Sequence, residues 1–411
     1  MPASAEPYIY ADNAATTPLS PAALQAMMPF LTSTFGNPSG IHRVAREAAD
    51  ALADARARIA TCLGAGAPND IFFTSGGSES DTWVLHGAVQ RFRDQFGAGA
   101  RVRVVTSAIE HHAILHGCDE LERAGVEIMH LPVDTEGFVA PADLRRALRD
   151  ASAADHAAGV DAPPAALVSI MLANNEVGAV QDIAQLAAIA HEFDVPFHTD
   201  AVQAVGHIPV DARALGVDAL SLSGHKFHGP RGIGALYLRP GFSIPPLITG
   251  GAQERGLRAG TENLAGAAGM AAALAEACAD LEPRAAHVAA LRDAFIQGIL
   301  DACENVQLTG PAPSEHRLPS IASFVCRDCD SELLVMLLDR AGVAAAAGSA
   351  CATGSTEPSH VITALGIADP TWAHGSVRFS LADDVSAADV DLLLERVPAC
   401  IRRARLISSM R

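Results

Sequence analysis

Short apolar runs alternate with longer helical patterns along the first 250 residues, and this alternation limits the folds open to the chain. Seven runs bounded by turn residues are predicted to be strands: 70–74, 102–106, 126–131, 166–172, 196–199, 219–223 and 234–238. Stretches with helical spacing, such as 45–62, 80–93 and 183–193, lie between most of them. Such alternation favours an α/β fold with a mostly parallel sheet.

The pattern changes after residue 250. The Gly-rich stretch GGAQERGLRAGTEN leads into one long helical run predicted over 264–303. The elements expected after it are a strand at 321–325, a helix at 331–341, a small-residue loop at 344–359, a strand at 377–381 and a helix at 387–397. We therefore predict a large domain at 23–282 and a smaller α+β domain built from 1–22 and 283–411. The Ala-, Pro- and Gly-rich segment 151–164 is predicted to be a surface loop.

The charge and the cysteine content exclude several classes of partner and location. The net charge is −18, whereas nucleic acids and anionic membranes attract basic surfaces, so we expect neither as a direct ligand. Neither a signal-peptide pattern nor an apolar run of about 18 residues occurs in the sequence. Eight cysteines in 411 residues are too sparse for a disulfide scaffold. A cytoplasmic, reducing location is expected.

The chain has a single lysine, Lys226, and its other 28 basic residues are all arginine. A guanidinium stays protonated, so arginine replaces lysine where only charge matters but not where an amine must lose its proton. Lys226 follows the predicted strand 219–223, and active-site groups gather at such strand ends. It is a candidate for covalent bonding to a substrate ketone or to pyridoxal phosphate, and the alternative is a lysine left by chance.

Two residues before the lysine are suited to the ring of pyridoxal phosphate. Asp200 ends the strand-like VPFHTD and could hold a proton on the ring nitrogen, while Gln203 could reach the ring hydroxyl. Taken alone, an aspartate at this place is as well explained as a helix N-cap. His111 follows another predicted strand and could stack on the ring and move protons. The neighbouring His112 has no ligand pattern that predicts a zinc site.

Phosphate donors are predicted at two places. Gly77 and Ser78 open a helix after the strand IFFT, where exposed N–H groups bind phosphate, although an ordinary capped turn looks the same. Ser223 and His225 flank the lysine and could add donors. No dinucleotide or P-loop glycine pattern is present, so nicotinamide and nucleotide cofactors have no fingerprint.

One cysteine is a candidate nucleophile. Cys351 lies among small residues in AAAAGSACATGSTEPSH, a setting that suits a reactive thiol but also a simple small-residue position. Cys326 and Cys329 form a C-x-x-C without a second pair at metal spacing, and we interpret them as incidental. The remaining cysteines fall in apolar helical contexts and are expected in or near the core: Cys62, Cys118, Cys278, Cys303 and Cys400.

Arg378 and Asn175 are candidates for binding a substrate carboxylate. Arg378 lies in the strand-like GSVRFSL and its guanidinium could hold a carboxylate bidentately. Asn175 lies in LANNEVG after a predicted strand and could share the same group. Each is equally compatible with a structural polar role.

Taken together, these stretches resemble the NifS/IscS-type cysteine desulfurases, which are aminotransferase class V enzymes. The matching segments run in order along nearly the whole chain: YADNAATTP, FGNPSGIHRVARE, FTSGGSESD, IEHHAIL, ANNEVGAVQDI, HTDAVQAVG, SGHKFHGPRGIGALY, ERGLRAGTEN, GSACATGSTEPSH and HGSVRFSL. The resemblance implies the fold type I architecture of pyridoxal phosphate enzymes, acting as homodimers with shared active sites.

The resemblance also assigns roles residue by residue. It implies Lys226 as the Schiff-base lysine, Asp200 as the partner of the ring nitrogen and Cys351 as the cysteine that takes sulfur as a persulfide. The other roles are implied as follows: ring hydroxyl, Gln203; ring stacking and proton transfer, His111; phosphate, Gly77, Ser78, Ser223 and His225; the partner subunit's phosphate, Thr261; substrate carboxylate, Asn175 and Arg378. No metal is implied.

The implied reaction converts L-cysteine to L-alanine and passes the sulfur to an acceptor protein, either a scaffold or a sulfur carrier. Iron–sulfur cluster assembly, tRNA thiolation and DNA phosphorothioation are all served by such enzymes. A selenocysteine lyase or an aminotransferase of the same fold would share the cofactor residues, but an aminotransferase would not need Cys351. A non-catalytic sulfur-carrier scaffold is the alternative from a different class.

Overall fold

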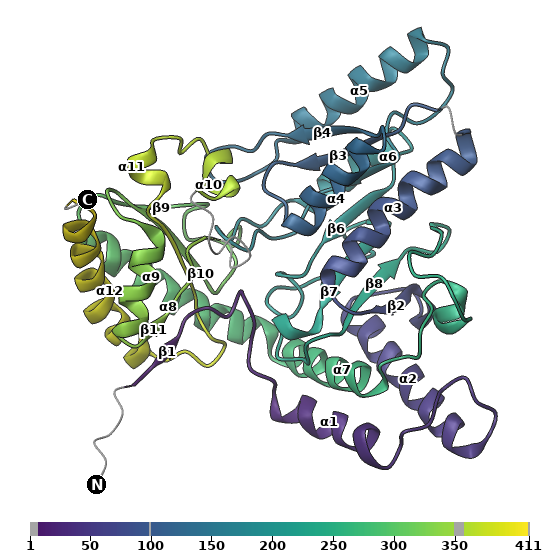
Figure 1. Cartoon of the computed structure of the whole chain (residues 1–411), viewed down its shortest axis with the longest axis horizontal. Helices are drawn as coiled ribbons and strands as arrows, with labels where there is room; N and C mark the ends of the chain where they lie inside the picture. Colours follow the sequence, from purple (N-terminus) through teal and green to yellow (C-terminus); the bar gives the residue numbers. More distant parts are fainter. Residues whose placement is uncertain (1–6, 98–99, 349–356, 410–411) are drawn as a thin grey trace.

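A seven-stranded sheet forms the centre of the computed structural model, which describes residues 7–97, 100–348 and 357–409 (Figure 1). Its strands are β2 (Ile71–Thr74), β3 (Arg103–Ser107), β4 (Glu127–Leu131), β5 (Leu167–Ser169), β6 (Phe197–Asp200), β7 (Ala219–Ser223) and β8 (Gly234–Leu238). The strand order is β2-β8-β7-β6-β5-β3-β4, and only β8 runs antiparallel to its neighbours. All seven predicted strands are confirmed, although β5 is shorter than expected, and so is the mostly parallel α/β fold.

Helices cover both faces of this sheet, which explains why its strands are apolar on both sides. One face packs against α1 (Pro21–Thr32), α2 (Arg43–Cys62), α5 (Pro141–Ala157), α6 (Ile183–His191) and α7 (Leu264–Ala279). The other face packs against α3 (Gly77–Phe96) and α4 (His112–Arg123). Short 3-10 turns lie at η1 (Pro68–Asp70), η2 (Gly224–Lys226) and η3 (Gln253–Gly256). The carboxyl edge of the sheet is left open to loops.

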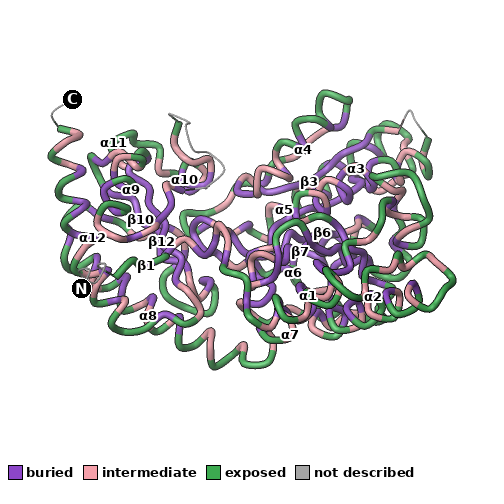
Figure 2. The backbone as a smooth tube through the Cα atoms, turned by 60° about the horizontal axis from the view of Figure 1, so that its bottom comes forward, coloured by how far each residue is buried: buried purple, intermediate pink, exposed green. Residues whose placement is uncertain are grey.

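The C-terminal part has a hydrophobic core of its own, and Figure 2 shows buried residues gathered there and around the main sheet. A three-stranded antiparallel sheet in the order β12-β10-β9 packs against three long helices. The elements are β9 (Val306–Leu308), β10 (Ile321–Cys326), β12 (Ser376–Ser380), α8 (Leu281–Ala302), α9 (Ser331–Arg340), α12 (Ala387–Ser408) and the short α10 (His360–Ala364) and α11 (Pro370–Ala373).

The N-terminal strand β1 (Ile9–Tyr10) joins this core by pairing in parallel with β11 (Val343–Ala344). Ile9 and Ala11 are buried among the side chains of the C-terminal core, so the chain begins there before it enters the main sheet. This arrangement is compatible with grouping 1–22 with the smaller domain, and the domain boundaries themselves stay a prediction.

Two expectations about the helices are wrong. The run predicted over 264–303 is two helices, α7 and α8, which meet at Asp280 with a bend of 73°. The apolar pattern continues through the break, so the pattern alone does not reveal it. No single helix in the described ranges is long and apolar enough to span a membrane, and α7 and α8 meet that test only as a bent pair.

The segment 151–164 is only partly a loop, because α5 continues to Ala157. Its alanines are strong helix formers, and Asp155 is buried by its contact with the sheet. The Asp155 carboxylate accepts from both terminal nitrogens of Arg103 in β3, at 2.5 and 2.8 Å. A buried, bidentate ion pair therefore fixes the end of a helix that composition alone made look like a surface loop.

Candidate active site

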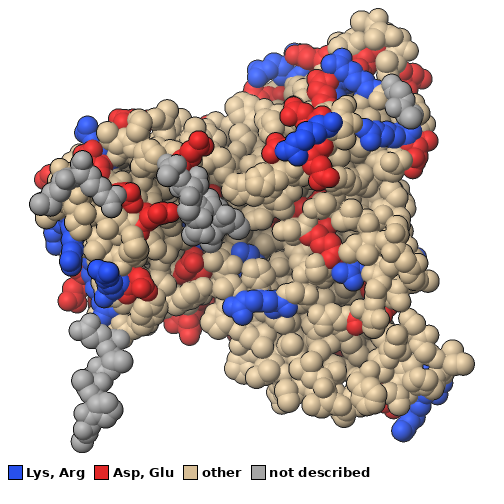
Figure 3. Space-filling view, viewed as in Figure 1, with Lys and Arg blue, Asp and Glu red and all other residues tan. Residues whose placement is uncertain are grey.

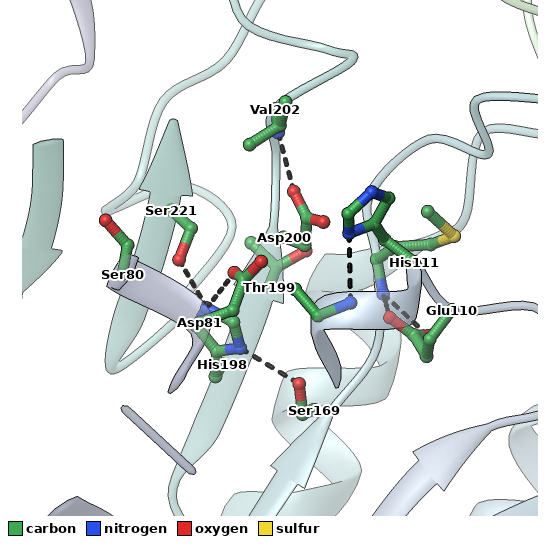
Figure 4. A network of polar contacts seen from close by, with 12 residues as sticks. Ser80, Asp81, Glu110, His111, Ser169, His198, Thr199, Asp200, Val202 and Ser221 are labelled. Carbon is green, nitrogen blue, oxygen red and sulfur yellow. Dashed lines mark hydrogen bonds and ion pairs between the residues drawn. The ribbon is translucent and has the colours of Figure 1, made fainter. Parts of the chain in front are cut away.

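Polar side chains from several strands meet at the carboxyl edge of the main sheet (Figure 4). Asp200 is the last residue of β6, His111 follows β3 and caps α4, and Lys226 closes the turn η2 after β7. Parallel neighbouring strands end on one side of a sheet, so their following residues come close together. Polar atoms of Asp200, His111 and Asp81 all lie within 4.8 Å of one another, and Asp81 was not predicted.

Asp200 is buried, and its orientation is fixed by the backbone. Its Oδ1 accepts from the Val202 N–H at 2.9 Å, and the other residues nearest to its charge are His111 and Lys226. Burial raises the pKa of Asp200, while His111, the Val202 N–H and Lys226 lower it. These contacts favour the ionised form and suit a carboxylate that faces a cation.

Asp81 lies beside Asp200 on the first turns of α3 and is also buried. Burial raises the pKa of Asp81 well above its usual value, and the neighbouring Asp200 raises it further. Two buried carboxyl groups at this separation do not both ionise at neutral pH. Because Asp200 has the better partners, we place the negative charge on Asp200 and the proton on Asp81.

A buried histidine supports this pair from within the sheet. His198 hydrogen-bonds Ser169 through Nδ1 and Ser221 through Nε2, both at 2.9 Å, and Nε2 lies 3.7 Å from Asp81. Complete burial lowers the pKa of His198 to about 3, so the ring is neutral. A neutral ring needs one acceptor and one donor, and two serine hydroxyls supply both roles. His198 was not predicted.

Glu110 precedes His111 and is held below the site. Its carboxylate accepts from Ser107 Oγ at 2.5 Å and from the Met171 N–H at 3.0 and 3.1 Å. Burial raises the pKa of Glu110 to about 8 despite these bonds. His111 Nδ1 accepts from the Ala113 N–H at 3.1 Å, so the loop and the helix cap together set the direction of the imidazole.

Lys226 points toward the N-terminal segment of the chain. Its Nζ donates to the carbonyl oxygens of Ala14 at 2.5 Å and Ala15 at 2.9 Å, and Gln203 Nε2 donates to Ala14 at 2.9 Å. The amine and the amide, both predicted as site residues, therefore meet at one carbonyl. His225 Nδ1 lies 3.1 Å from Thr16 Oγ1, and burial, with Lys226 second, lowers the pKa of His225 to about 4.

The start of α3 is pressed against β6 and β7, which requires glycine. A Cβ on Gly77 would stand 2.6 Å from Val202 Cγ2, and a Cβ on Gly76 would stand 3.7 Å from Ser223 Oγ. The first N–H groups of a helix have no acceptor inside it, and they carry the positive end of the helix dipole. Ser78 is exposed on this first turn, so the predicted phosphate donors from the helix and from Ser223 lie side by side.

Arg378 connects the C-terminal sheet to this edge. It is 1% exposed, and it donates to Asp12 Oδ1 at 2.7 Å and to the Asn175 carbonyl oxygen at 2.8 Å. Arg378 Nε is buried without a hydrogen-bond partner among the described residues. Buried donors are normally satisfied, so the guanidinium has capacity for a further anionic ligand. Asp12 was quoted in the motif YADNAATTP but not predicted as a site residue.

Glu176 holds both ends of the segment that contains the predicted nucleophile. Ser359 Oγ donates to Glu176 Oε2 at 2.6 Å, and a Cβ on Gly348 would stand 3.1 Å from the same oxygen. Burial raises the pKa of Glu176, and Arg378 lowers it. Cys351 itself lies outside the described residues. Glu176 follows Asn175 in ANNEVG, and a buried glutamate in a loop was the signal that could have found it.

The arrangement fits pyridoxal phosphate on features of the protein alone. A buried carboxylate, an adjacent histidine and one amine share an edge with a glycine-lined helix start, which suits a cationic ring that carries a phosphate. Thr261 is exposed on the segment before α7. Asp81, His111 and Asp200 form the only set of three close metal-ligand side chains in the described ranges, and His112 is not among them.

Comparison with known proteins places the chain within one family. Residues 9–393 match the sequence profile of aminotransferase class V. A cysteine desulfurase IscS of Methanosarcina thermophila is 43% identical over 402 residues, covering 98% of this chain and 94% of that protein. A solved NifS-like protein superposes with a TM-score of 0.85 at 33% identity, covering 96% of this chain and 100% of that chain. A structure described as SspA in complex with cysteine gives 0.75 at 31% identity and covers 91% and 98%.

Proposed function

The chain belongs to the aminotransferase class-V family as a pyridoxal-phosphate-dependent cysteine desulfurase, and from that premise we propose how its own residues divide the reaction. The observation that carries the proposal is the placement of the single lysine, Lys226, on the same sheet edge as the buried Asp200 and His111. An amine, an ionised carboxylate and an imidazole at one edge are the groups needed to withdraw a proton from an amino acid.

The residues that would hold the cofactor follow from these contacts. Lys226 would bind it covalently, Asp200 would hold the proton on its ring nitrogen, Gln203 would reach its hydroxyl and His111 would lie on its ring. The phosphate would be bound by Gly77, Ser78, Ser223 and His225, around the positive end of α3. When bound, this cofactor supplies an electron sink for the bonds at the substrate Cα.

The proton at the substrate Cα is the part of the reaction assigned to Lys226. A lysine amine near a cation and partly removed from water loses its proton more readily than one in solution. The carbonyl oxygens of Ala14 and Ala15, which accept from Nζ in the described structure, direct the amine to one side of the site. We propose that His111 assists the later return of a proton.

The substrate carboxylate is proposed to bind Arg378 and Asn175. The Arg378 guanidinium is buried, fixed by Asp12 on one side and by the Asn175 carbonyl oxygen on the other, and its Nε remains available. A guanidinium held in this way loses little freedom when it binds a carboxylate. The sulfur of the bound L-cysteine would then be attacked by the Cys351 thiolate, whose persulfide passes to an acceptor protein.

The activity can be tested with the unmodified protein. Purified enzyme supplied with L-cysteine and a thiol reductant should form alanine and sulfide in equal amounts, without any keto acid. Alanine formation that depends on an added keto acid would instead identify an aminotransferase, and a strong preference for selenocysteine would identify a selenocysteine lyase. A protein without the visible absorbance of bound cofactor and without turnover would favour a non-catalytic scaffold.

Replacing Asp200 with asparagine should lower kcat by about 10- to 100-fold, since a hydrogen bond to a charged group contributes about 1.5–3 kcal/mol and about 1.4 kcal/mol is tenfold. Asparagine still accepts from the Val202 N–H, so the fold is expected to persist. Steady-state alanine formation measures the effect. Asp211→Asn is the control, because Asp211 caps an exposed turn that asparagine also caps, and it should retain normal activity. Normal kcat in Asp200→Asn would contradict the assignment.

We propose that the enzyme acts as a homodimer with shared sites. Leu24, Met28 and Leu31 of α1 are about half exposed or more, and Phe35 and Ile41 in the following loop are 75% and 92% exposed. The surface over α1 carries few charged side chains in Figure 3. Large exposed apolar side chains gathered on one element are typical of a protein interface. The exposed Thr261 supports a contact to the partner subunit's phosphate.

A further inference from the structure

The proposed reaction leaves two neighbouring thiols of the C-terminal core unused. Cys326 ends β10, and Cys329 follows it across a tight turn in which the Cys329 N–H donates to the Cys326 carbonyl oxygen at 3.2 Å. The two thiols are hydrogen-bonded to each other. The C-x-x-C spacing, interpreted above as incidental, therefore builds a compact dithiol.

The turn is held in place by contacts from outside it. Arg405 of α12 donates from Nε to the Arg327 carbonyl oxygen at 3.0 Å and from Nη2 to the Asn305 carbonyl oxygen at 2.7 Å. The Asp328 N–H donates to the Thr371 carbonyl oxygen at 2.7 Å, and Asp328 itself has a φ of +58°. A left-handed aspartate inside a turn persists only when surrounding contacts determine it.

The two sulfur atoms have different chemical character. The hydrogen bond from Cys326 lowers the pKa of Cys329, and Arg405 lowers it further, whereas burial and Asp328 raise it. The same hydrogen bond, together with burial, raises the pKa of Cys326. Cys329 is 5% exposed and Cys326 is fully buried. Cys329 is thus the thiolate that reacts first, and Cys326 is the thiol that reacts second.

Cys329 also faces the space beside the catalytic cysteine segment. It lines a cavity of about 1270 Å³, together with Arg405, Ala346, Ala347 and Ser359. Cys351 follows Ala347 by four residues, and four residues reach at most about 14 Å. The other hydrogen-bonded thiol pair, Cys62 and Cys278, lies between α2 and α7 and does not line this cavity.

We propose that the Cys326–Cys329 dithiol is a second sulfur site that accepts sulfane sulfur within the chain, an inference that rests on the proposed formation of a persulfide at Cys351. The Cys329 thiolate attacks the outer sulfur of the persulfide, so that the S–S bond at Cys351 breaks, a new S–S bond forms at Cys329 and Cys351 leaves as a thiolate. The Cys326 thiol then attacks Cys329 Sγ, which releases hydrogen sulfide and leaves a Cys326–Cys329 disulfide. The two thiols are oxidised as the sulfane sulfur is reduced, and no outside oxidant is required.

The test follows the sulfur atom through the full-length holoenzyme. The enzyme is given L-cysteine without oxygen, alkylated and digested, and its peptides are identified by mass spectrometry. We expect a Cys326–Cys329 disulfide in the unmodified chain and a Cys329 persulfide that rises severalfold in Cys326→Ser. Cys329→Ser should carry neither. Cys400→Ser, which changes another buried cysteine of the same core, should match the unmodified chain.

Two arms separate the failure of this inference from the failure of the proposed function. If Cys351 carries a persulfide but the 326–329 peptide stays unmodified in every variant, the dithiol proposal is wrong. If Cys351 carries none, the proposed function fails, and inorganic polysulfide added to Cys351→Ser tests the dithiol directly. Cys329 should then gain sulfur before Cys303 and Cys400, and equal or slower labelling would overturn the proposal. Unchanged alanine formation in Cys326→Ser shows that this variant is folded.

Discussion

Lys226→Arg is expected to lower alanine formation from L-cysteine by at least about 10³-fold, because a positioned general base contributes about 10²–10⁴-fold and a guanidinium does not lose its proton. The substitution keeps the positive charge beside Asp200, so the electrostatics of the site change little. Arginine can also donate to the Ala14 and Ala15 carbonyl oxygens that now accept from Nζ, so the local fold should survive. The measurement is steady-state alanine formation with saturating cofactor.

Covalent labelling supplies the second measurement on the same variant. Borohydride reduction of the unmodified holoenzyme should attach the cofactor to one peptide only, the one that contains Lys226, and the variant should show no label. Arg58→Lys is the control, because Arg58 is exposed on α2 and the change adds a second lysine away from the site. It should be labelled only at Lys226 and remain active. Normal turnover in Lys226→Arg would refute the central assignment.

Cys351→Ser is expected to abolish persulfide formation and to slow alanine formation by at least about 10³-fold, since a thiol is a few per cent thiolate at neutral pH and a serine hydroxyl is essentially never ionised. The variant changes one atom in a segment anchored at Gly348 and Ser359 through Glu176, so cofactor binding should be unaffected. Alanine, sulfide and protein-bound sulfane sulfur are measured together.

The cofactor measurement separates this variant from a folding defect. Cys351→Ser should keep the visible absorbance of the holoenzyme and the borohydride label on Lys226, in contrast to Lys226→Arg. Cys400→Ser, a change of the same size in the C-terminal core, should behave as the unmodified enzyme. If Cys351→Ser makes alanine and sulfide at the full rate, the nucleophile lies elsewhere in the chain.

The elements that could be predicted from sequence are those whose residues already contain their own signal. The seven strands of the main sheet are short, apolar and bounded by turns, because both faces are covered by helices. The break between α7 and α8 could not be predicted, because both helices keep an apolar pattern and the bend at Asp280 depends on what each packs against. The helical end of α5 was missed for a similar reason, since Asp155 is stabilised by a partner 52 residues away.

The site residues divide in the same way. Lys226, Asp200 and His111 were predicted because their positions after strands and their chemistry are visible in the chain. Asp81 and His198 were missed because their roles depend on which strands are neighbours: His198 on β6 meets Ser169 of β5 and Ser221 of β7. Strand order is a property of the sheet and not of any single strand.

The sequence by itself determined the chemistry: one amine among 28 guanidinium groups, and a family resemblance that runs along nearly the whole chain. Only the tertiary structure decided the electrostatics. It placed the charge on Asp200 and a proton on Asp81, fixed Arg378 between Asp12 and Asn175, and joined Cys326 to Cys329 at a cavity wall. Burial and separation set these properties, because a charge in a low-dielectric interior is stabilised only by the groups that the fold brings within a few ångströms of it.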